Sequence, residues 1–277
     1  MPAIDLSRLR KQATRLADFF FVPDEFMKHL HEMLDFYVNR SLRTVQNVAP
    51  GSTLATYRTS PVILKRIEQE LAQIAQDNPS ASLGLADLLW DEGYLETCLL
   101  AAFLLGRIPP QEERLLARLT AWTQQVRDPS VRAALLTTSL ARMRQETPDQ
   151  FLTLVSEWLH PARTRTWSNG VQALLPLVAD PEFENLPPVL DILEPVVEAA
   201  PAIIQVDLKD LILTLYQAFP TETTFFLRQA LTNSTNPMTS ITFRRISSAF
   251  PAELQSELRE LIRASSLRTK PSPEKGG

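Results

Sequence analysis

The sequence is poor in the residues that build disulfides, phosphate-binding loops and metal sites. Its 277 residues include one cysteine, seven glycines and three histidines. With a single cysteine, Cys98, no disulfide framework can form within the chain, and a reducing intracellular compartment is expected. The glycines are isolated or terminal, so neither G-x-G-x-x-G nor G-x-x-x-x-G-K-[ST] occurs, and we predict no nucleotide and no other cofactor.

Other absences argue against a metal site, a catalytic triad and a membrane-spanning segment. His29 and His31 lie two residues apart and His160 is remote in sequence, which predicts no metal site and no catalytic triad. The first residues mix charged and apolar side chains, unlike a signal peptide. The longest apolar run, from Thr97 to Gly106, is shorter than the roughly 20 residues that cross a bilayer, so we expect a soluble cytoplasmic protein that does not contact the membrane.

What the sequence does contain is a regular series of prolines. Six of them stand 31, 38, 39, 33 and 31 residues apart, each just before an apolar helical pattern. They are Pro79, Pro110, Pro148, Pro187, Pro220 and Pro251. Proline favours the first helical turn because its φ is preset and its missing N–H would be unpaired there. A period of this length with two helices in each repeat is the spacing of HEAT and related repeats.

Three successive repeats share a tryptophan near the end of their first helix, namely Trp90, Trp122 and Trp158. In each repeat the tryptophan follows the proline by ten to twelve residues, and a polar break and a second apolar helix come next. We therefore predict an all-α fold, a HEAT-like α-solenoid of antiparallel helix pairs, curved with a concave face. Periodic tryptophans indicate packing between repeats, although a groove can also offer them to stack on bases.

The pattern predicts 12 to 14 helices and no strands. They are expected near residues 5–20, 24–47, 61–77, 80–91, 94–106, 111–126, 130–145, 149–159, 165–179, 187–199, 202–218, 221–231, 239–249 and 252–265. Residues 1–60 are interpreted as an N-terminal helical pair and a loop that runs from Val48 to Ser60. Residues 61–266 form one continuous repeat array, and the polar segment 267–277 is expected to be a disordered tail.

Charge is distributed unevenly, although the formal net charge is only −4. Segment 114–144 carries six arginines against Asp128 alone, a net of +5, whereas segment 180–210 carries eight acidic residues against Lys209, a net of −7. Arginine suits bidentate contact with phosphate, so a basic stripe on a concave surface predicts contact with a phosphate backbone. The alternative interpretation is a solvated helix face with local ion pairs.

A second basic cluster occupies the segment HPARTRTWSN, residues 160–169. It combines His160, Arg163 and Arg165 with Trp167 at the predicted start of a helix. Basic and aromatic side chains at a helix N-terminus can hold a phosphate. The alternative is that Trp167 seals the interface between two repeats.

Two stretches resemble a known family. Residues 85–108, LADLLWDEGYLETCLLAAFLLGRI, resemble the Leu-Trp…Glu…Ala…Leu-Leu core of the bacterial HEAT-like DNA alkylation repair superfamily, which includes alkylpurine DNA glycosylases. Residues 157–178, EWLHPARTRTWSNGVQALLPLV, resemble the next Trp-containing repeat of that family. By repeat order the resemblance covers roughly residues 60–250. It implies a concave basic groove that holds duplex DNA and, in the glycosylases, aromatic side chains around the lesion with an Asp that assists loss of a cationic base.

The resemblance also shows where this chain departs from the catalytic pattern. The family places that Asp four residues after a Trp. With Trp122 as the Trp, the corresponding residue is Val126, and the nearest carboxylate is Asp128. Because Asp128 precedes Pro129 in a predicted turn, a helix N-cap is the alternative to a catalytic role.

Two more family positions differ. The family's Arg aligns with Gly170, and its second cleft tryptophan falls near Leu211 or Ile212. We therefore expect weak or absent release of N-alkylated purines, with Asp128 as the one candidate catalytic residue.

The resulting hypothesis is a DNA alkylation repair-like HEAT-repeat protein that binds duplex DNA through a basic concave surface. The predicted DNA-binding residues are Arg127, Arg132, Arg163, Arg165, Arg244, Arg245, Trp122 and Trp167. The alternative is a non-enzymatic scaffold that holds a protein partner in the same groove. The isoelectric point near 5.5 favours the scaffold, and the arginine-rich middle favours DNA.

Overall fold

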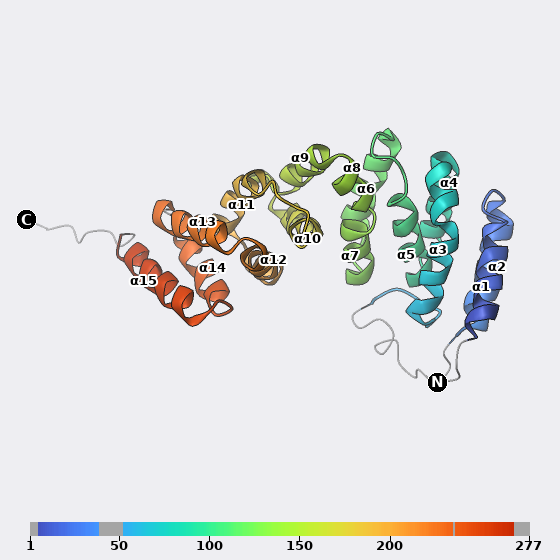
Figure 1. Ribbon diagram of the computed structural model, residues 1–277, viewed down its shortest axis with the longest axis horizontal. Coiled ribbons are helices and arrows are strands. Elements are labelled where there is room, and N and C mark those ends of the chain that lie inside the picture. The colour runs from blue at the N-terminus through green and yellow to red at the C-terminus, as the bar shows by residue number, and fades with distance from the viewer. Residues whose placement is uncertain (1–4, 39–51, 235, 269–277) are drawn as a thin grey trace, which may run out of the picture. The chain divides into compact units, whose positions relative to one another are not determined.

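The computed structural model describes residues 5–38, 52–234 and 236–268. In this part of the chain the regular secondary structure consists of α-helices and short 3-10 helices, without a β-strand, which confirms the all-α prediction (Figure 1). The chain divides into two compact units, unit 1 at Met1–Pro148 and unit 2 at Asp149–Gly277. The predicted boundary after residue 60 stays a prediction, as do the curvature and the concave face.

Unit 1 is a stack of helices that pack on their neighbours in sequence and one helix further. Its helices are α1 (Leu6–Ala17), α2 (Pro23–Phe36), α3 (Pro61–Asp77), α4 (Pro79–Asp91), α5 (Leu95–Leu105), α6 (Glu113–Gln125), α7 (Pro129–Thr137) and α8 (Ala141–Glu146). Helix α1 packs on α2 and α3, and α5 packs on α3, α4 and α7. This pairing of each helix with the next but one is what stacked helical repeats require.

Unit 2 has two rows of helices. Its elements are α9 (Pro148–Trp158), η2 (Pro161–Thr166), α10 (Trp167–Val178), α11 (Pro187–Ala199), η3 (Ala202–Ile204), α12 (Gln205–Ala218), α13 (Pro220–Asn233), α14 (Pro237–Ser247) and α15 (Ala252–Arg268). Contacts join α10, α12 and α14 in one row and α11, α13 and α15 in the other. Asp191, Glu194 and Glu198 of the acidic segment lie on α11, in the second row, whereas Asp207 and Asp210 lie on α12, in the first row.

The prolines mark helix starts as the sequence predicted. Pro79, Pro148, Pro187 and Pro220 are each the first residue of a helix, and α15 begins directly after Pro251. Helix α6 begins three residues after Pro110, which is the one proline of the series that lies in a turn. The missing N–H of proline is tolerated at these positions because no intrahelical acceptor is available to it.

The helix predicted at 130–145 is two helices, α7 and α8, separated by a short turn. The hydroxyl of Ser139 donates to the carbonyl of Ala102 in α5 at 2.8 Å. The carbonyl of Thr138 lies against Gly106, where an added Cβ would be 2.2 Å from that oxygen. Contacts with α5 thus interrupt a segment whose own periodicity favours a continuous helix.

Two other predicted segments extend beyond the described residues. Helix α2 ends at Phe36, earlier than predicted, and residues 39–47 of that expected helix lie outside the described part. Helix α15 reaches Arg268, and the predicted tail lies outside the described part from residue 269 onward.

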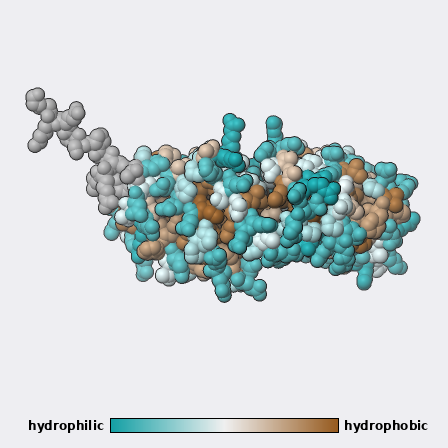
Figure 2. All heavy atoms as spheres, turned by 90° about the horizontal axis from the view of Figure 1, so that it is seen from above, coloured by the Kyte–Doolittle hydropathy of each residue, from teal (hydrophilic) through white to brown (hydrophobic). Residues whose placement is uncertain are grey.

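The core of each unit consists of leucine, isoleucine, valine and alanine from the inward faces of the helices, with buried tryptophan and phenylalanine between them. Burial of these apolar side chains is the main stabilising contribution to such a fold. On the face shown in Figure 2, hydrophilic side chains predominate and hydrophobic atoms emerge in patches between them. Among the exposed apolar side chains, Ile203 and Phe225 are 86% and 66% exposed.

Candidate nucleic-acid interface

The turn η2, between α9 and α10, presents two exposed arginines. The guanidinium groups of Arg163 and Arg165 have no hydrogen-bond or ion-pair partner among the described residues. Arg163 leaves the helical region, with φ −121° and ψ 46°, so the turn is kinked at the first of the two. Both charges are therefore available to a ligand.

Hydrogen bonds fix this turn to the helices on either side. Nδ1 of His160 accepts from the N–H of Ala162 at 3.2 Å. The hydroxyl of Thr166 donates to the carbonyl of Trp158 at 2.6 Å, and the indole N–H of Trp167 donates to the carbonyl of His160 at 3.0 Å. Because the backbone is held while the arginine side chains are free, the turn presents its two charges at a defined place.

Side-chain hydrogen bonds join the start of α10 to the start of α12, and α12 to the end of α14. Oδ2 of Asp207 accepts from Ser168 and from Gln172, both at 2.9 Å. Gln205, the first residue of α12, accepts from the guanidinium of Arg245 in α14. These links bring η2 and the last turn of α14 to one edge of unit 2. Its exposed arginines, which we call the arginine edge, are Arg163, Arg165, Arg244 and Arg245.

In unit 1 the two predicted DNA-binding arginines differ from each other. Arg127 is exposed and has no partner among the described residues. Arg132 is half-buried and donates to the carbonyl of Val126 at 2.8 Å, so it satisfies the C-terminal end of α6. Of the pair, only Arg127 presents an uncommitted charge.

The other arginines of the basic segment 114–144 are largely committed to neighbouring groups. Arg118 forms two hydrogen bonds of 2.6 Å with Asp87. Arg114 and Arg142 each donate one hydrogen bond to a glutamate, Glu112 and Glu146 respectively. The alternative interpretation of this segment, a helix face with local ion pairs, therefore describes these three arginines.

Three of the four tryptophans are buried in the core, and Trp90 is half-buried. The rings of Trp90 and Trp122 stack at 4.3 Å with an angle of 2°, joining α4 to α6 across two repeats. Trp122, Trp158 and Trp167 are 7%, 6% and 1% exposed. These contacts agree with the interpretation that the periodic tryptophans pack between helices. The burial of Trp122 and Trp167 does not support the prediction that they contact DNA, because their rings fill spaces between helices.

Asp128, the candidate catalytic residue, has both carboxylate oxygens occupied by protein donors. Oδ1 accepts from the N–H groups of Ser130 and Val131 at 3.0 and 3.1 Å, which caps α7. Oδ2 accepts from the hydroxyl of Ser52 at 2.6 Å and from the N–H of Thr53 at 2.8 Å. The residue is 1% exposed. It is the helix N-cap that the sequence offered as the alternative.

Two opposing effects act on the pKa of Asp128. Burial raises the pKa, but the hydrogen bonds from the loop and from the first turn of α7 outweigh it and hold the pKa below its ordinary value of 3.8. The carboxylate is therefore ionised at neutral pH. Its oxygens point at backbone and serine donors instead of into a space where a sugar could lie.

Comparison with known families adds to this geometry. Residues 59–239 match the family described as DNA alkylation repair enzyme, which is more than half of the chain. The chain belongs to this family. The resemblance of residues 85–108 and 157–178 is thereby confirmed, since both stretches lie inside the matched region. The chain matches no curated protein and no solved structure with which it was compared.

At the positions where the resemblance aligns catalytic residues of alkylation repair glycosylases, this member has core residues. Val126 is 7% exposed. At Gly170 an added Cβ would be 2.4 Å from Cγ of Leu159, so the space at this position is too small for an arginine. Leu211 and Ile212 are fully buried. Each of these positions is packed in the core.

Sequence reasoning missed how the loop at residues 52–60 is held. Glu96, in the first turn of α5, is 2% exposed and accepts from the hydroxyl of Thr56 at 2.7 Å and from the N–H of Tyr57 at 3.0 Å. Arg58 has a φ of 57°, and its N–H donates to the hydroxyl of Thr56. The signal in the sequence is the density of hydroxyl residues in STLATYRTS. With Asp128, Glu96 forms a pair of buried carboxylates that bind this loop.

Other classes of site find no support in the described residues. No three His, Cys, Asp or Glu side chains of that part come together as metal ligands. Cys98 is buried, which raises the pKa of its thiol to about 11, so it stays protonated. None of the helices in the described ranges is long and apolar enough to cross a bilayer.

Proposed function

We propose that the protein binds duplex DNA through the arginine edge of unit 2 and does not release alkylated bases. The observation that carries this proposal is the turn η2. Its backbone is fixed by hydrogen bonds, while Arg163 and Arg165 are exposed and have no partner among the residues that the structure describes. Membership in the DNA alkylation repair family supports DNA as the ligand.

The chemistry of the edge favours the phosphate backbone. Guanidinium groups donate two parallel hydrogen bonds to phosphate oxygens, and neutralised phosphates release counterions. Contacts of this kind carry no base information, so we expect similar affinity for unrelated sequences. Arg244 extends the edge from α14, and Arg127 in unit 1 offers one further exposed charge.

We expect no base release because of where the carboxylates lie. Stabilising a departing cationic base requires an ionised carboxylate aimed at the sugar. Asp128, the N-cap of α7, and Glu96, in the first turn of α5, are instead buried and bound to the loop at residues 52–60. Neither is available to a substrate while that loop is in place.

Fluorescence anisotropy with labelled duplexes of unrelated sequence tests the proposed interface. We expect Arg163→Ala/Arg165→Ala to weaken binding about tenfold or more for every duplex, because two charge-assisted contacts are lost. The matched control is Arg259→Ala/Arg263→Ala, which removes the same charge from exposed positions on α15. Equal loss of affinity in the two double variants would show that only the net charge matters. Full affinity of Arg163→Ala/Arg165→Ala would exclude the η2 arginines from the interface.

A further inference from the structure

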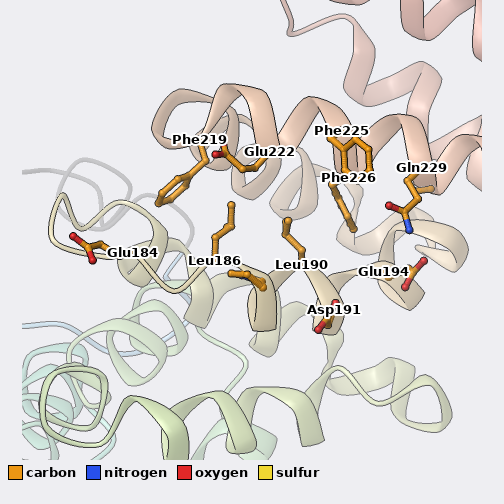
Figure 3. Close-up of a pocket in the computed structure, with 12 residues that line it drawn as sticks. Glu184, Leu186, Leu190, Asp191, Glu194, Phe219, Glu222, Phe225, Phe226 and Gln229 are labelled. Carbon is orange, nitrogen blue, oxygen red and sulfur yellow. The ribbon is translucent and has the colours of Figure 1, made fainter.

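A groove lies between α11 and α13, the neighbouring helices of the second row of unit 2 (Figure 3). It has a volume of about 440 Å³. Its floor is apolar, with Leu186 and Leu190 from the α11 side facing Phe219 and Phe226 from the α13 side. We call it the α11–α13 groove. It lies in the row of α11, α13 and α15, whereas the arginine edge lies at η2 and α14.

The charged residues that line the groove are all acidic. They are Glu184, Asp191, Glu194 and Glu222. All four are exposed, and none forms an ion pair with another residue of the described ranges. Four carboxylates around one cavity without a basic residue create a negative potential that the groove itself does not neutralise. A cationic ligand would relieve their mutual repulsion.

A solvent-exposed aromatic side chain also lines the α11–α13 groove. Phe225 of α13 lines the groove and is 66% exposed, whereas its neighbour Phe226 is 8% exposed and forms part of the floor. Large aromatic side chains are the usual anchors of protein interfaces because burying them removes much apolar area from water at little conformational cost. The groove therefore combines an apolar anchor with an acidic rim.

The spacing of the lining residues gives the length of the groove. On α11 they run from Pro187 to Glu194 and on α13 from Glu222 to Ala230, at intervals of three or four residues. At 1.5 Å per residue, this is about 12 Å, or two helical turns. Two parallel walls of this length accommodate a short helix that presents apolar residues at i, i+3 or i+4, and i+7.

We propose that the α11–α13 groove binds a basic amphipathic helix of a partner protein. Apolar side chains of that helix lie on the floor and against Phe225, and lysine or arginine residues on its flanks face the four carboxylates. This occupant satisfies the apolar floor, the charge and the length of the groove together.

Selection from a displayed library of random peptides identifies what the groove prefers without assuming a sequence. The full-length protein serves as target, and binders that also recognise the Phe225→Ala variant are removed. We expect the remaining peptides to carry large apolar residues at helical spacing, flanked by lysine and arginine. An absence of groove-dependent peptides, or their being neutral or acidic, would overturn the proposal.

Affinities of the best selected peptide then test the two parts of the groove. We expect Glu194→Gln/Glu222→Gln and Phe225→Ala each to weaken binding at least tenfold, and the affinity for wild type to fall as salt is raised. Control variants at exposed positions outside the groove are Glu157→Gln/Glu253→Gln and Ile203→Ala. Equal weakening by these controls would place the peptide elsewhere.

Two further readouts separate this proposal from its competitors. Sedimentation velocity of the free protein should show no concentration-dependent dimer. A dimer abolished by Phe225→Ala would make a second copy the occupant and overturn the proposal. Peptide binding should also be unchanged in Arg163→Ala/Arg165→Ala, which separates the groove from the arginine edge. Loss of peptide binding in this variant would contradict the assignment.

Discussion

Asp128 joins two segments that are far apart in sequence, since the same carboxylate caps α7 and holds Ser52 and Thr53 of the loop. Replacing it with Asn keeps one oxygen for the cap but turns an N–H₂ group toward the N–H of Thr53. We expect Asp128→Asn to lower the free energy of unfolding at neutral pH by about 1–3 kcal/mol, because a buried donor loses its acceptor. Urea denaturation followed by circular dichroism measures this change. Asp149→Asn, an exposed carboxylate on α9, is the control and should change stability by less than about 0.5 kcal/mol.

The same residue predicts a pH dependence. The pKa of Asp128 in the folded protein lies below its ordinary value of 3.8, so its contribution is fully present above about pH 4 and is lost as the pH falls through the folded pKa. The difference in stability between wild type and Asp128→Asn should therefore narrow below pH 4. A difference that stays constant down to acid unfolding would contradict the assignment of the ionised carboxylate to this role.

At the scale of single residues, local interactions were predictable from the sequence and long-range interactions were not. The Asp-Pro pair predicted the N-cap because capping is a local interaction. The bonds from Ser52 and Thr53 cross more than 70 residues of chain, and no local pattern encodes them. The burial of Trp167 likewise depends on neighbouring helices, so the sequence left two interpretations open.

At the scale of elements, alanine substitutions at two glycines test how closely α5 packs against the turn after α7. At Gly106 an added Cβ would be 2.2 Å from the backbone oxygen of Thr138, whereas at Gly84, within α4, nothing lies within 4 Å. Gly106→Ala should destabilise by about 2 kcal/mol or more, since backbone must move. Gly84→Ala should stabilise by about 0.5–1 kcal/mol through its higher helix propensity. Thermal unfolding of both variants is the measurement, and equal shifts would refute the close approach at Gly106.

The helices themselves were largely predictable, because proline positions and apolar periodicity are local signals. Helices α3 and α11 have the predicted bounds. The break between α7 and α8 was not predictable, since a hydrogen bond from Ser139 to α5 interrupts the segment. The acidic character of segment 180–210 was visible in the sequence, but the α11–α13 groove requires knowing that these two helices are neighbours.

For the molecule as a whole, the chain belongs to the DNA alkylation repair family, and we propose that it does not release bases. The Asp position of the family is Val126, and Asp128 and Glu96 are bound to the loop. We expect no release of 3- or 7-methylpurine from alkylated duplex DNA above the uncatalysed background, because no described carboxylate of α5 or α7 is free to face a sugar. Chromatography of released bases is the assay. Robust release that Asp128→Asn abolishes, at a temperature where the variant is folded, would assign catalysis to Asp128 and contradict this prediction.

The salt dependence of DNA binding tests the central claim most directly. If the arginine edge contacts phosphates, the logarithm of the association constant falls linearly with the logarithm of salt concentration, by about 0.9 for each phosphate neutralised. For Arg163→Ala/Arg165→Ala we expect a slope that is flatter by about one to two units, whereas Arg259→Ala/Arg263→Ala should keep the wild-type slope. Parallel lines for wild type and the η2 variant would contradict the account.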